Sequence, residues 1–363
     1  MIKASKNWFD EINYLRAIAI IAVVIIHATD DTFFLHKLNK MVFMLIYIEE
    51  LSRFAVPMFI FISGFVLYNK YKSELPMRDF YMKRFSTIIL PYIFFSVIYD
   101  IMMSYPTSSS VNLNSITQSI FNFDASGHLW YIKLILTFYI FFPVIIAYYD
   151  TLKKYTRVDT FIAIILSTLI LYLFEWFVCQ QNITNDSPLR FLIYFLLGIY
   201  VNDNYEQISK ILERIALKKV IMLAIPIVIL PFFTMIFWID ARCGTQFANY
   251  IPHYTQLALI SEAILHIFIF VLCIHLILSY KPKSRIIQEI GEYSYGIFLI
   301  HAVFHNLLAI YILPSLSISI ESLTYYVILF SVTMLASYFA VKLMLTNNVT
   351  ALIITGKQHH KQI

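Results

Sequence analysis

The sequence has few charged residues: Asp, Glu, Lys and Arg make up 13% of its 363 residues, whereas aliphatic, aromatic and sulfur-containing residues make up 60%. A soluble domain of this length does not need so much apolar surface, but a helix bundle solvated by lipid does. The composition therefore indicates a polytopic membrane protein. The formal net charge of +5 is not evidence for a nucleic-acid partner, because the basic residues are sorted by loop.

The sequence also lacks internal repeats, low-complexity tracts and a Gly-rich phosphate loop, and its three cysteines have neither metal nor redox spacing. The first apolar segment is too long for the core of a signal peptide and is interrupted by Arg16. No soluble domain interrupts the chain. We therefore expect one integral-membrane domain, residues 1–363, with a helical core of about residues 13–345.

Ten apolar runs approach the roughly 20 residues that a membrane-spanning helix needs, so we predict an all-α bundle of about ten transmembrane helices. The predicted spans are about 13–33, 41–69, 85–104, 128–149, 158–178, 189–201, 220–239, 254–279, 291–312 and 322–345. The sixth is short, so it either tilts little, thins the bilayer locally or is packed inside the bundle.

The charge of the loops orients these spans. With the N-terminus inside, 21 of the 27 basic residues fall on the cytoplasmic side, and the opposite loop 105–127 contains no Lys or Arg. The other six basic residues are Lys37, Lys40, Arg53, Lys133, Arg190 and Arg242. This positive-inside bias predicts that both termini are cytoplasmic. Frequent Ile, Lys and Asn indicate an AT-rich bacterial genome. The absence of outer-membrane features then favours a plasma membrane.

The first span, which reads NYLRAIAIIAVVIIHATDD, carries Arg16 near its start and His27 near its end. Arg16 and His27 are eleven residues apart, so on a helix they point the same way and lie about 16 Å apart along the axis. Arg16 alone can be explained as an interfacial residue that reaches lipid phosphate, and His27 as a packed histidine. A charge inside a span normally faces a polar interior, and the shared face favours one active site.

Arg53 lies near the middle of the second predicted span, so we expect it to face the same polar interior as His27. Ser63 and Gly64 in that span are typical of close helix packing, with a catalytic serine as the alternative. The polar residues expected to pair with the intramembrane cations Arg53, Lys133 and Arg190 are Glu175, Glu262 and His266.

Lys83 and Arg84 end a basic stretch at the predicted cytoplasmic mouth of the bundle. Ordinary positive-inside charge that binds anionic lipid explains them, and so does a site for a nucleotide or diphosphate. On the opposite side His128 and Trp130 begin a span. Tryptophan is common at the interface, but a His–Trp pair also suits sugar recognition.

His301 and His305 are one helical turn apart in the ninth predicted span. Such a pair can ligate a metal, but no third ligand has suitable spacing, so no metal site is predicted. A helix-lining or substrate-contacting role is favoured for both histidines.

Five pieces of the sequence together resemble the integral-membrane acyltransferase 3 family, which O-acylates bacterial glycans. They are YLRAIAIIAVVIIH, VPMFIFISGF, FYMKRFSTIILPY, GHLWYIKLIL and YSYGIFLIH, in family order from residue 14 to residue 301. The R-x10-H span followed by PxFxFxSG and HLWY is specific as a set. The stand-alone ten-span form is similar to the branch that includes the biofilm polysaccharide O-succinyltransferases, without the extracellular hydrolase-like domain of some relatives.

The resemblance implies an enzyme that moves an acetyl or succinyl group from cytoplasmic acyl-CoA to a hydroxyl of a cell-surface or exported glycan. It implies that His27 and Arg16 are the catalytic pair. We expect His27 to act as general base, with acyl transfer either direct or relayed through a covalent acyl-His. Acyl-CoA is then a co-substrate held by Arg16, Lys83 and Arg84, and no permanently bound cofactor is expected. The residues expected to contact substrate are Arg53, Ser63, His128, Trp130 and His301.

The expected partners are membrane lipids, acyl-CoA, the glycan acceptor, and a separate glycan synthase or extracellular acyl-handling protein. The alternative function is a transporter or flippase that exports a glycan or lipid-linked sugar, which also needs intramembrane charges. Against it, the sequence shows no internal repeat and no clearly paired broken helices. A sensor or scaffold would leave the alignment of Arg16 with His27 unexplained.

Overall fold

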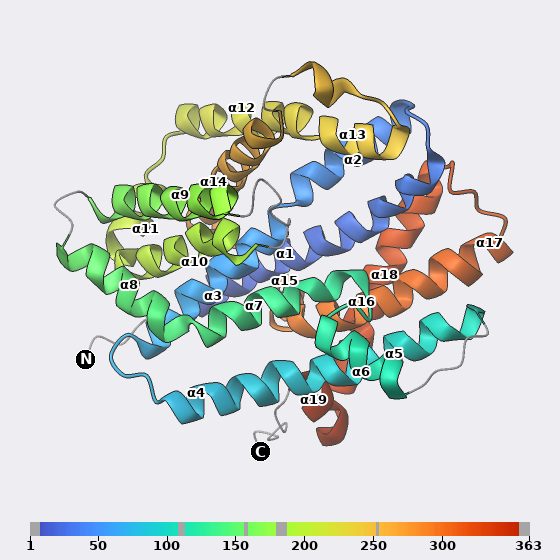
Figure 1. The fold of residues 1–363 in the computed structure, drawn as a ribbon, viewed down its shortest axis with the longest axis horizontal. Helices are drawn as coiled ribbons and strands as arrows, with labels where there is room; N and C mark the ends of the chain where they lie inside the picture. The colour runs from blue at the N-terminus through green and yellow to red at the C-terminus, as the bar shows by residue number, and fades with distance from the viewer. Residues whose placement is uncertain (1–7, 108–112, 156–158, 179–186, 252–253, 356–363) are drawn as a thin grey trace. The chain divides into compact units, whose positions relative to one another are not determined.

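The computed structural model describes residues 8–107, 113–155, 159–178, 187–251 and 254–355. Over these ranges all regular structure is helical, which confirms the predicted all-α chain (Figure 1). The two chain ends, predicted to be cytoplasmic, lie outside the described residues, as does Cys179. Cys243 and Cys273 are free cysteines.

Contacts within the chain define two compact units, which we describe separately. The first unit comprises Met1–Phe59 and Glu206–Val341, and the second comprises Ile60–Tyr205 and Lys342–Ile363. The single integral-membrane domain expected over residues 1–363 stays a prediction.

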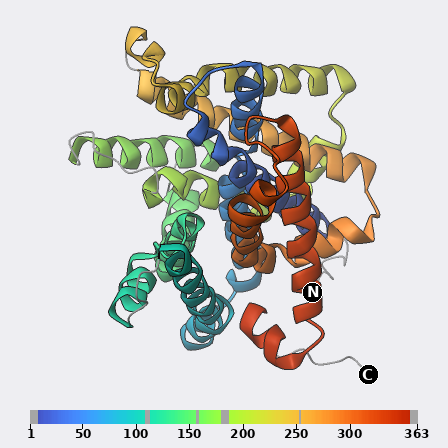
Figure 2. The ribbon, with the colours of Figure 1, turned by 90° about the vertical axis from the view of Figure 1, so that its right-hand side faces the viewer.

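The first unit is organised around helix α1 (Trp8–Asp30). This helix packs against α2 (Lys40–Ser52), α15 (Arg285–Glu292) and α16 (Ser294–Leu307), so the start of the chain lies beside segments from its last quarter. Figure 2 shows the blue of α1 next to the orange and red of these late helices. The other elements of this unit are η1 (Asp31–Leu35), α11 (Tyr205–Glu213), α12 (Leu217–Thr234), α13 (Ile236–Cys243), η4 (Phe247–Tyr250), α14 (Tyr254–Tyr280), η5 (Leu308–Ile312), α17 (Leu313–Ser315) and α18 (Leu323–Met344).

The second unit contains most of α3 (Ala55–Tyr71) and a set of shorter helices. The helix α9 (Thr160–Val178) packs along α10 (Pro188–Asp203), and α19 (Asn348–Thr355) returns to contact α5 (Leu90–Thr107). The other elements are α4 (Met77–Arg84), η2 (Phe85–Ile89), α6 (Leu113–Asn122), η3 (Gly127–Leu129), α7 (Trp130–Ile140) and α8 (Phe142–Tyr155).

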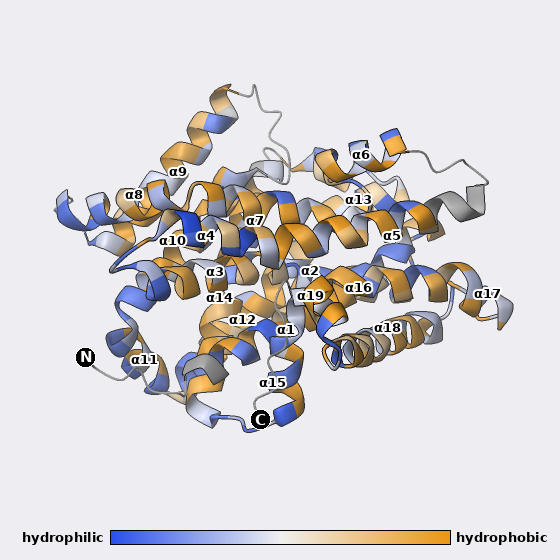
Figure 3. Ribbon diagram, turned by 90° about the horizontal axis from the view of Figure 1, so that it is seen from below, coloured by the Kyte–Doolittle hydropathy of each residue, from blue (hydrophilic) through white to orange (hydrophobic). Residues whose placement is uncertain are grey.

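Within the described residues, seven helical segments are long and apolar enough to cross a membrane, or up to eight if the bent pair α7–α8 forms one span. The seven are Glu11–Leu35, Lys40–Tyr71, Met77–Met102, Lys218–Cys243, Leu257–Tyr280, Ser294–Ser315 and Leu323–Met344. In Figure 3 the long helices are mainly hydrophobic, whereas α11 and α15 carry many hydrophilic residues. This confirms a polytopic membrane helix bundle. The fifth and sixth predicted spans are the shorter helices α9 and α10, so the number ten and the orientation stay predictions.

Prolines account for the breaks in the long helices. The second predicted span consists of α2 and α3, separated at Arg53 and Phe54, shortly before Pro57. The fourth predicted span bends by 59° at Phe141, two residues before Pro143. Two π-helical turns also precede prolines: Phe85–Ile89 before Pro91, and Leu308–Ile312 before Pro314. A proline lacks the backbone donor and its ring clashes with the carbonyl of residue i−4, which favours a break, bend or π-helical turn just before it, although α12 continues through Pro226.

Two glycines let α3 and α10 cross with their backbones in contact. A Cβ atom at Gly64 would collide with the carbonyl oxygen of Phe195, and one at Gly198 would collide with that of Phe61. Small residues at a crossing allow such close approach in membrane bundles. Gly64 therefore has the packing role that its size predicts.

We expect Gly198→Ala to lower the free energy of unfolding by about 1–3 kcal/mol, because the added methyl overpacks the crossing. The readout is the melting temperature of the purified, detergent-solubilised protein. Gly127→Ala is the matched control, since a Cβ atom there meets nothing within 4 Å. An unchanged melting temperature for Gly198→Ala would contradict the close crossing.

Candidate active site

Helix α1 runs without interruption from Trp8 to Asp30, so Arg16 and His27 lie on one helix as the spacing predicts. Both residues are partly buried. At 1.5 Å per residue, eleven residues separate them by about 16 Å along the axis. The N-terminal half of α1 lies tightly against α15, where a Cβ atom at Gly291 would collide with the carbonyl oxygen of Asn13.

His27 faces an acidic side chain and a second imidazole. Its Nδ1 atom is 3.6 Å from Oδ2 of Asp30, one turn further along α1, and its ring centroid is 5.0 Å from that of His301 on α16. The side chain of His27 is 29% exposed, whereas His301 is completely buried. The structure thus brings together two of the predicted site residues from opposite ends of the chain.

The hydrogen-bond partners of His301 define its tautomer. Its Nδ1 atom is 3.2 Å from the carbonyl oxygen of Ile297 and 2.8 Å from that of Phe298. A carbonyl oxygen can only accept, so Nδ1 of His301 carries the hydrogen and Nε2 is the acceptor of the neutral ring. Beside His27, this ring can accept a hydrogen bond from a hydroxyl or from a protonated imidazole.

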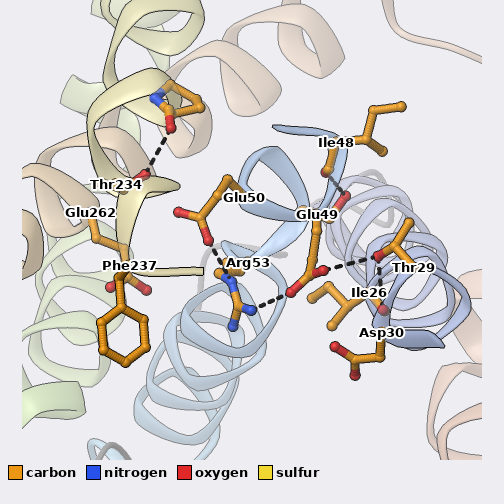
Figure 4. A network of polar contacts seen from close by, with 12 residues as sticks. Ile26, Thr29, Asp30, Ile48, Glu49, Glu50, Arg53, Thr234, Phe237 and Glu262 are labelled. Atoms are coloured by element: carbon orange, nitrogen blue, oxygen red, sulfur yellow. Dashed lines mark hydrogen bonds and ion pairs between the residues drawn. The ribbon is translucent and has the colours of Figure 1, made fainter. Parts of the chain in front are cut away.

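Arg53 ends α2 and forms ion pairs with Glu49 and Glu50 (Figure 4). Its Nε atom is 2.6 Å from Oε1 of Glu50, and its guanidinium carbon lies 3.7 Å from the ring centroid of Trp238, a cation–π contact. These ion-pair partners come from the preceding turn rather than from the distant residues expected, although Glu262 does act on Arg53 electrostatically. The overlooked signal is the i, i+3 and i, i+4 spacing, which places both carboxylates on the face of Arg53.

Arg242, which the loop-charge count assigned to the non-cytoplasmic side, is a buried member of the same network. Its side chain has no exposed surface, and its Nη2 atom is 2.6 Å from Oε2 of Glu49 and 3.4 Å from Oδ1 of Asp30. Its guanidinium carbon lies 4.6 Å from the ring centroid of Phe33. Glu49 is 193 residues away in sequence, and no local spacing connects the two.

Glu49 therefore joins Arg53 to Arg242, and Asp30 joins Arg242 to His27. The hydroxyl of Thr29 donates to Glu49 at 3.3 Å, which ties the network to α1 (Figure 4). A buried charge is costly unless it is paired, so each guanidinium in this apolar bundle needs its carboxylates. The network ends at a partly exposed imidazole, which can take up and release a proton without leaving a buried charge unpaired.

The second histidine of the late pair belongs to a different cluster. His305 Nε2 lies 4.0 Å from Oδ1 of Asp31, and Oδ2 of Asp31 accepts a hydrogen bond of 2.6 Å from Tyr325. Among the residues that the structure describes, no group of three or more His, Cys, Asp or Glu side chains is arranged to hold a metal ion.

In the second unit, Tyr139 brings Ser63 and Arg84 together. Its hydroxyl is 3.5 Å from Oγ of Ser63, and its ring centroid is 5.0 Å from the guanidinium carbon of Arg84. Arg84 also lies 5.3 Å from the ring centroid of Phe80, and Lys83 precedes it in the last turn of α4. Sequence spacing gives no indication of this three-residue contact.

His128 is buried, with Nδ1 3.0 Å from Oγ of Ser126 and its ring edge-on to Tyr99 at 5.3 Å. Trp130 begins α7 with its ring 6.2 Å from that of Phe191. The predicted site residues thus form two groups. Arg16, His27, Arg53 and His301 belong to the first unit, and Ser63, Lys83, Arg84, His128 and Trp130 belong to the second.

Comparison with known proteins bears on the chemistry. The family model described as "Acyltransferase domain" (Acyl_transf_3) matches residues 9–342. A probable poly-beta-1,6-N-acetyl-D-glucosamine export protein of Staphylococcus aureus (strain MSSA476) is 24% identical over 308 residues, which cover 81% of each chain. The putative membrane-bound acyltransferase YfiQ of Bacillus subtilis (strain 168) is 22% identical over 312 residues, 81% of this chain and 80% of its own.

No solved structure matches the chain. The family match nevertheless covers nearly all of the sequence, including α1, the buried ionic network and the late histidine helix. Together with the apolar helices, it identifies a multi-pass membrane enzyme. The chain belongs to the acyltransferase 3 family of membrane acyltransferases.

Proposed function

We propose that the protein transfers an acetyl or succinyl group from cytoplasmic acyl-CoA to a hydroxyl of a cell-surface or exported glycan, in a bacterial plasma membrane. The observation that carries this proposal is the position of His27. It shares an unbroken helix with Arg16 and lies between the carboxylate of Asp30 and the imidazole of His301, in a chain of an acyltransferase family.

In the proposed reaction His27 is the general base. It takes the proton of the glycan hydroxyl while the hydroxyl oxygen attacks the carbonyl carbon of the thioester. A new ester C–O bond forms, the C–S bond breaks, and the departing thiolate takes the proton from the imidazolium to give CoA–SH. Donor and acceptor exchange one acyl group and one proton, so no oxidant or reductant is required.

The proposed acyl-CoA contacts are cationic. Guanidinium groups bind phosphate through paired hydrogen bonds, and the guanidinium of Arg84 makes cation–π contacts with the rings of Phe80 and Tyr139. Arg16 and Lys83 are the other proposed phosphate contacts. The proposed substrate contacts are Arg53, Ser63, His128, Trp130 and His301, and a separate glycan synthase or extracellular acyl-handling protein is the proposed partner.

Glycan export is the second candidate function. It is favoured by the Staphylococcus relatives, which are named as probable poly-beta-1,6-N-acetyl-D-glucosamine export proteins. Acyl transfer yields an acylated sugar, whereas export leaves the glycan unmodified. Purified protein in nanodiscs is given acetyl-CoA or succinyl-CoA with a β-1,6-linked N-acetylglucosamine oligosaccharide, and mass spectrometry detects the acylated sugar. Transport of unmodified glycan by a protein without such activity would support export instead.

Replacing His27 by Ala is expected to lower kcat for acyl transfer by about 10²–10⁴-fold, the usual contribution of a general base. His36→Asn is the control, because His36 is an exposed histidine outside the site with a left-handed backbone that Asn tolerates. Glycan acylation that survives both His27→Ala and Arg16→Ala would refute the catalytic assignment.

Replacing Arg84 by Gln is expected to raise KM for acyl-CoA about tenfold with little change in kcat, because a lost charge-assisted phosphate contact weakens ground-state and transition-state binding alike. Arg78→Gln removes an exposed cation from the same helix and is the matched control. If both variants raise KM equally, the effect is general surface charge and Arg84 makes no specific contact.

A further inference from the structure

We propose that Asp30 is the positioning residue of His27, and that the buried Arg242 holds Asp30 in place for this role. The inference rests on the proposed function of His27 as general base. It assigns a task to two residues that sequence reasoning did not place in the site.

The two oxygens of the Asp30 carboxylate face different groups. Oδ2 is 3.6 Å from Nδ1 of His27, and Oδ1 is 3.4 Å from Nη2 of Arg242. Figure 4 shows the carboxylate projecting from α1 toward the side of Arg53 and Glu49. The carboxylate therefore lies between an imidazole on its own helix and a cation on α13.

Arg242 is a fixed anchor. Its side chain is fully buried, its Nη2 atom also pairs with Glu49 at 2.6 Å, and the rings of Phe33 and Trp238 lie 4.6 and 5.6 Å from its guanidinium carbon. A cation held on several sides cannot follow a moving partner. It therefore keeps Asp30 ionised and restricts the rotamer of this 43% exposed side chain.

A carboxylate opposite Nδ1 selects the tautomer of His27. It favours a hydrogen on Nδ1, which leaves the lone pair on Nε2 to accept the substrate proton. It also stabilises the imidazolium that forms when the proton is taken up. The separation of 3.6 Å is longer than a hydrogen bond, and catalytic hydrogen bonds are often long in the absence of substrate and tighten when it binds.

The test is steady-state kinetics of Asp30→Asn with acetyl-CoA or succinyl-CoA and the β-1,6-linked N-acetylglucosamine oligosaccharide. The amide keeps the shape of the side chain but can donate to Nδ1 and so permits the wrong tautomer. We expect kcat to fall at least 100-fold with KM within threefold of the wild-type value. Asp30→Glu, which restores the charge one methylene further away, is expected to recover kcat to about tenfold below wild type.

Asp31→Asn is the matched control. It removes the neighbouring carboxylate, which accepts from Tyr325, so it is expected to lower the melting temperature while kcat stays within threefold. A kcat for Asp30→Asn within threefold of wild type overturns the proposal, as does a loss of kcat that follows the fraction of unfolded protein and disappears when activity is normalised to folded protein. If Asp30→Asn does not accumulate in the membrane, Asp30→Ser decides, and a kcat within threefold of wild type there overturns the proposal.

The activity of His27→Ala distinguishes a failure of the positioning role of Asp30 from a failure of the proposed function. Inactive His27→Ala with fully active Asp30→Asn refutes the positioning role and leaves the proposed function standing. Active His27→Ala refutes the general base itself.

Discussion

A charge buried in an apolar bundle must be matched by an opposite charge, and this constraint organises the first unit. Two guanidiniums, those of Arg53 and Arg242, are held by Glu49, Glu50 and Asp30, with Glu49 shared between them. Removing one member would leave a buried charge uncompensated, which typically costs about 3–5 kcal/mol. The network thereby ties α1, α2 and α13 to one another through side chains rather than through loops.

The same network determines what His27 can do. An imidazole surrounded only by apolar side chains would be a poor proton acceptor, because nothing would stabilise its charged form. Asp30 supplies an anion within 3.6 Å of Nδ1 of His27. His301 supplies a neighbouring ring whose Nδ1 faces two backbone carbonyl oxygens. The proposed chemistry and the packing of the first unit therefore involve the same ion pairs.

Much of the fold is readable from the chain because its causes are local. Apolar runs of span length predict the long helices, and the prolines at positions 57, 91, 143 and 314 follow the breaks and π-helical turns within them. Of the ionic network, the pairing of Arg53 with Glu49 and Glu50 and that of His27 with Asp30 follow from local spacing. The contact of Arg242 with Glu49 is invisible to any helical period.

The sequence by itself determined the membrane class, the single face shared by Arg16 and His27, and the family motifs, since composition and helical spacing depend on neighbours along the chain. Only the tertiary structure decided that His301 lies against His27, that Arg242 is buried beside Asp30 and Glu49, and that Tyr139 contacts both Ser63 and Arg84. These contacts join segments dozens to hundreds of residues apart. Their partners are selected by how helices pack and by the cost of leaving a charge without one, and neither is encoded in spacing along one helix.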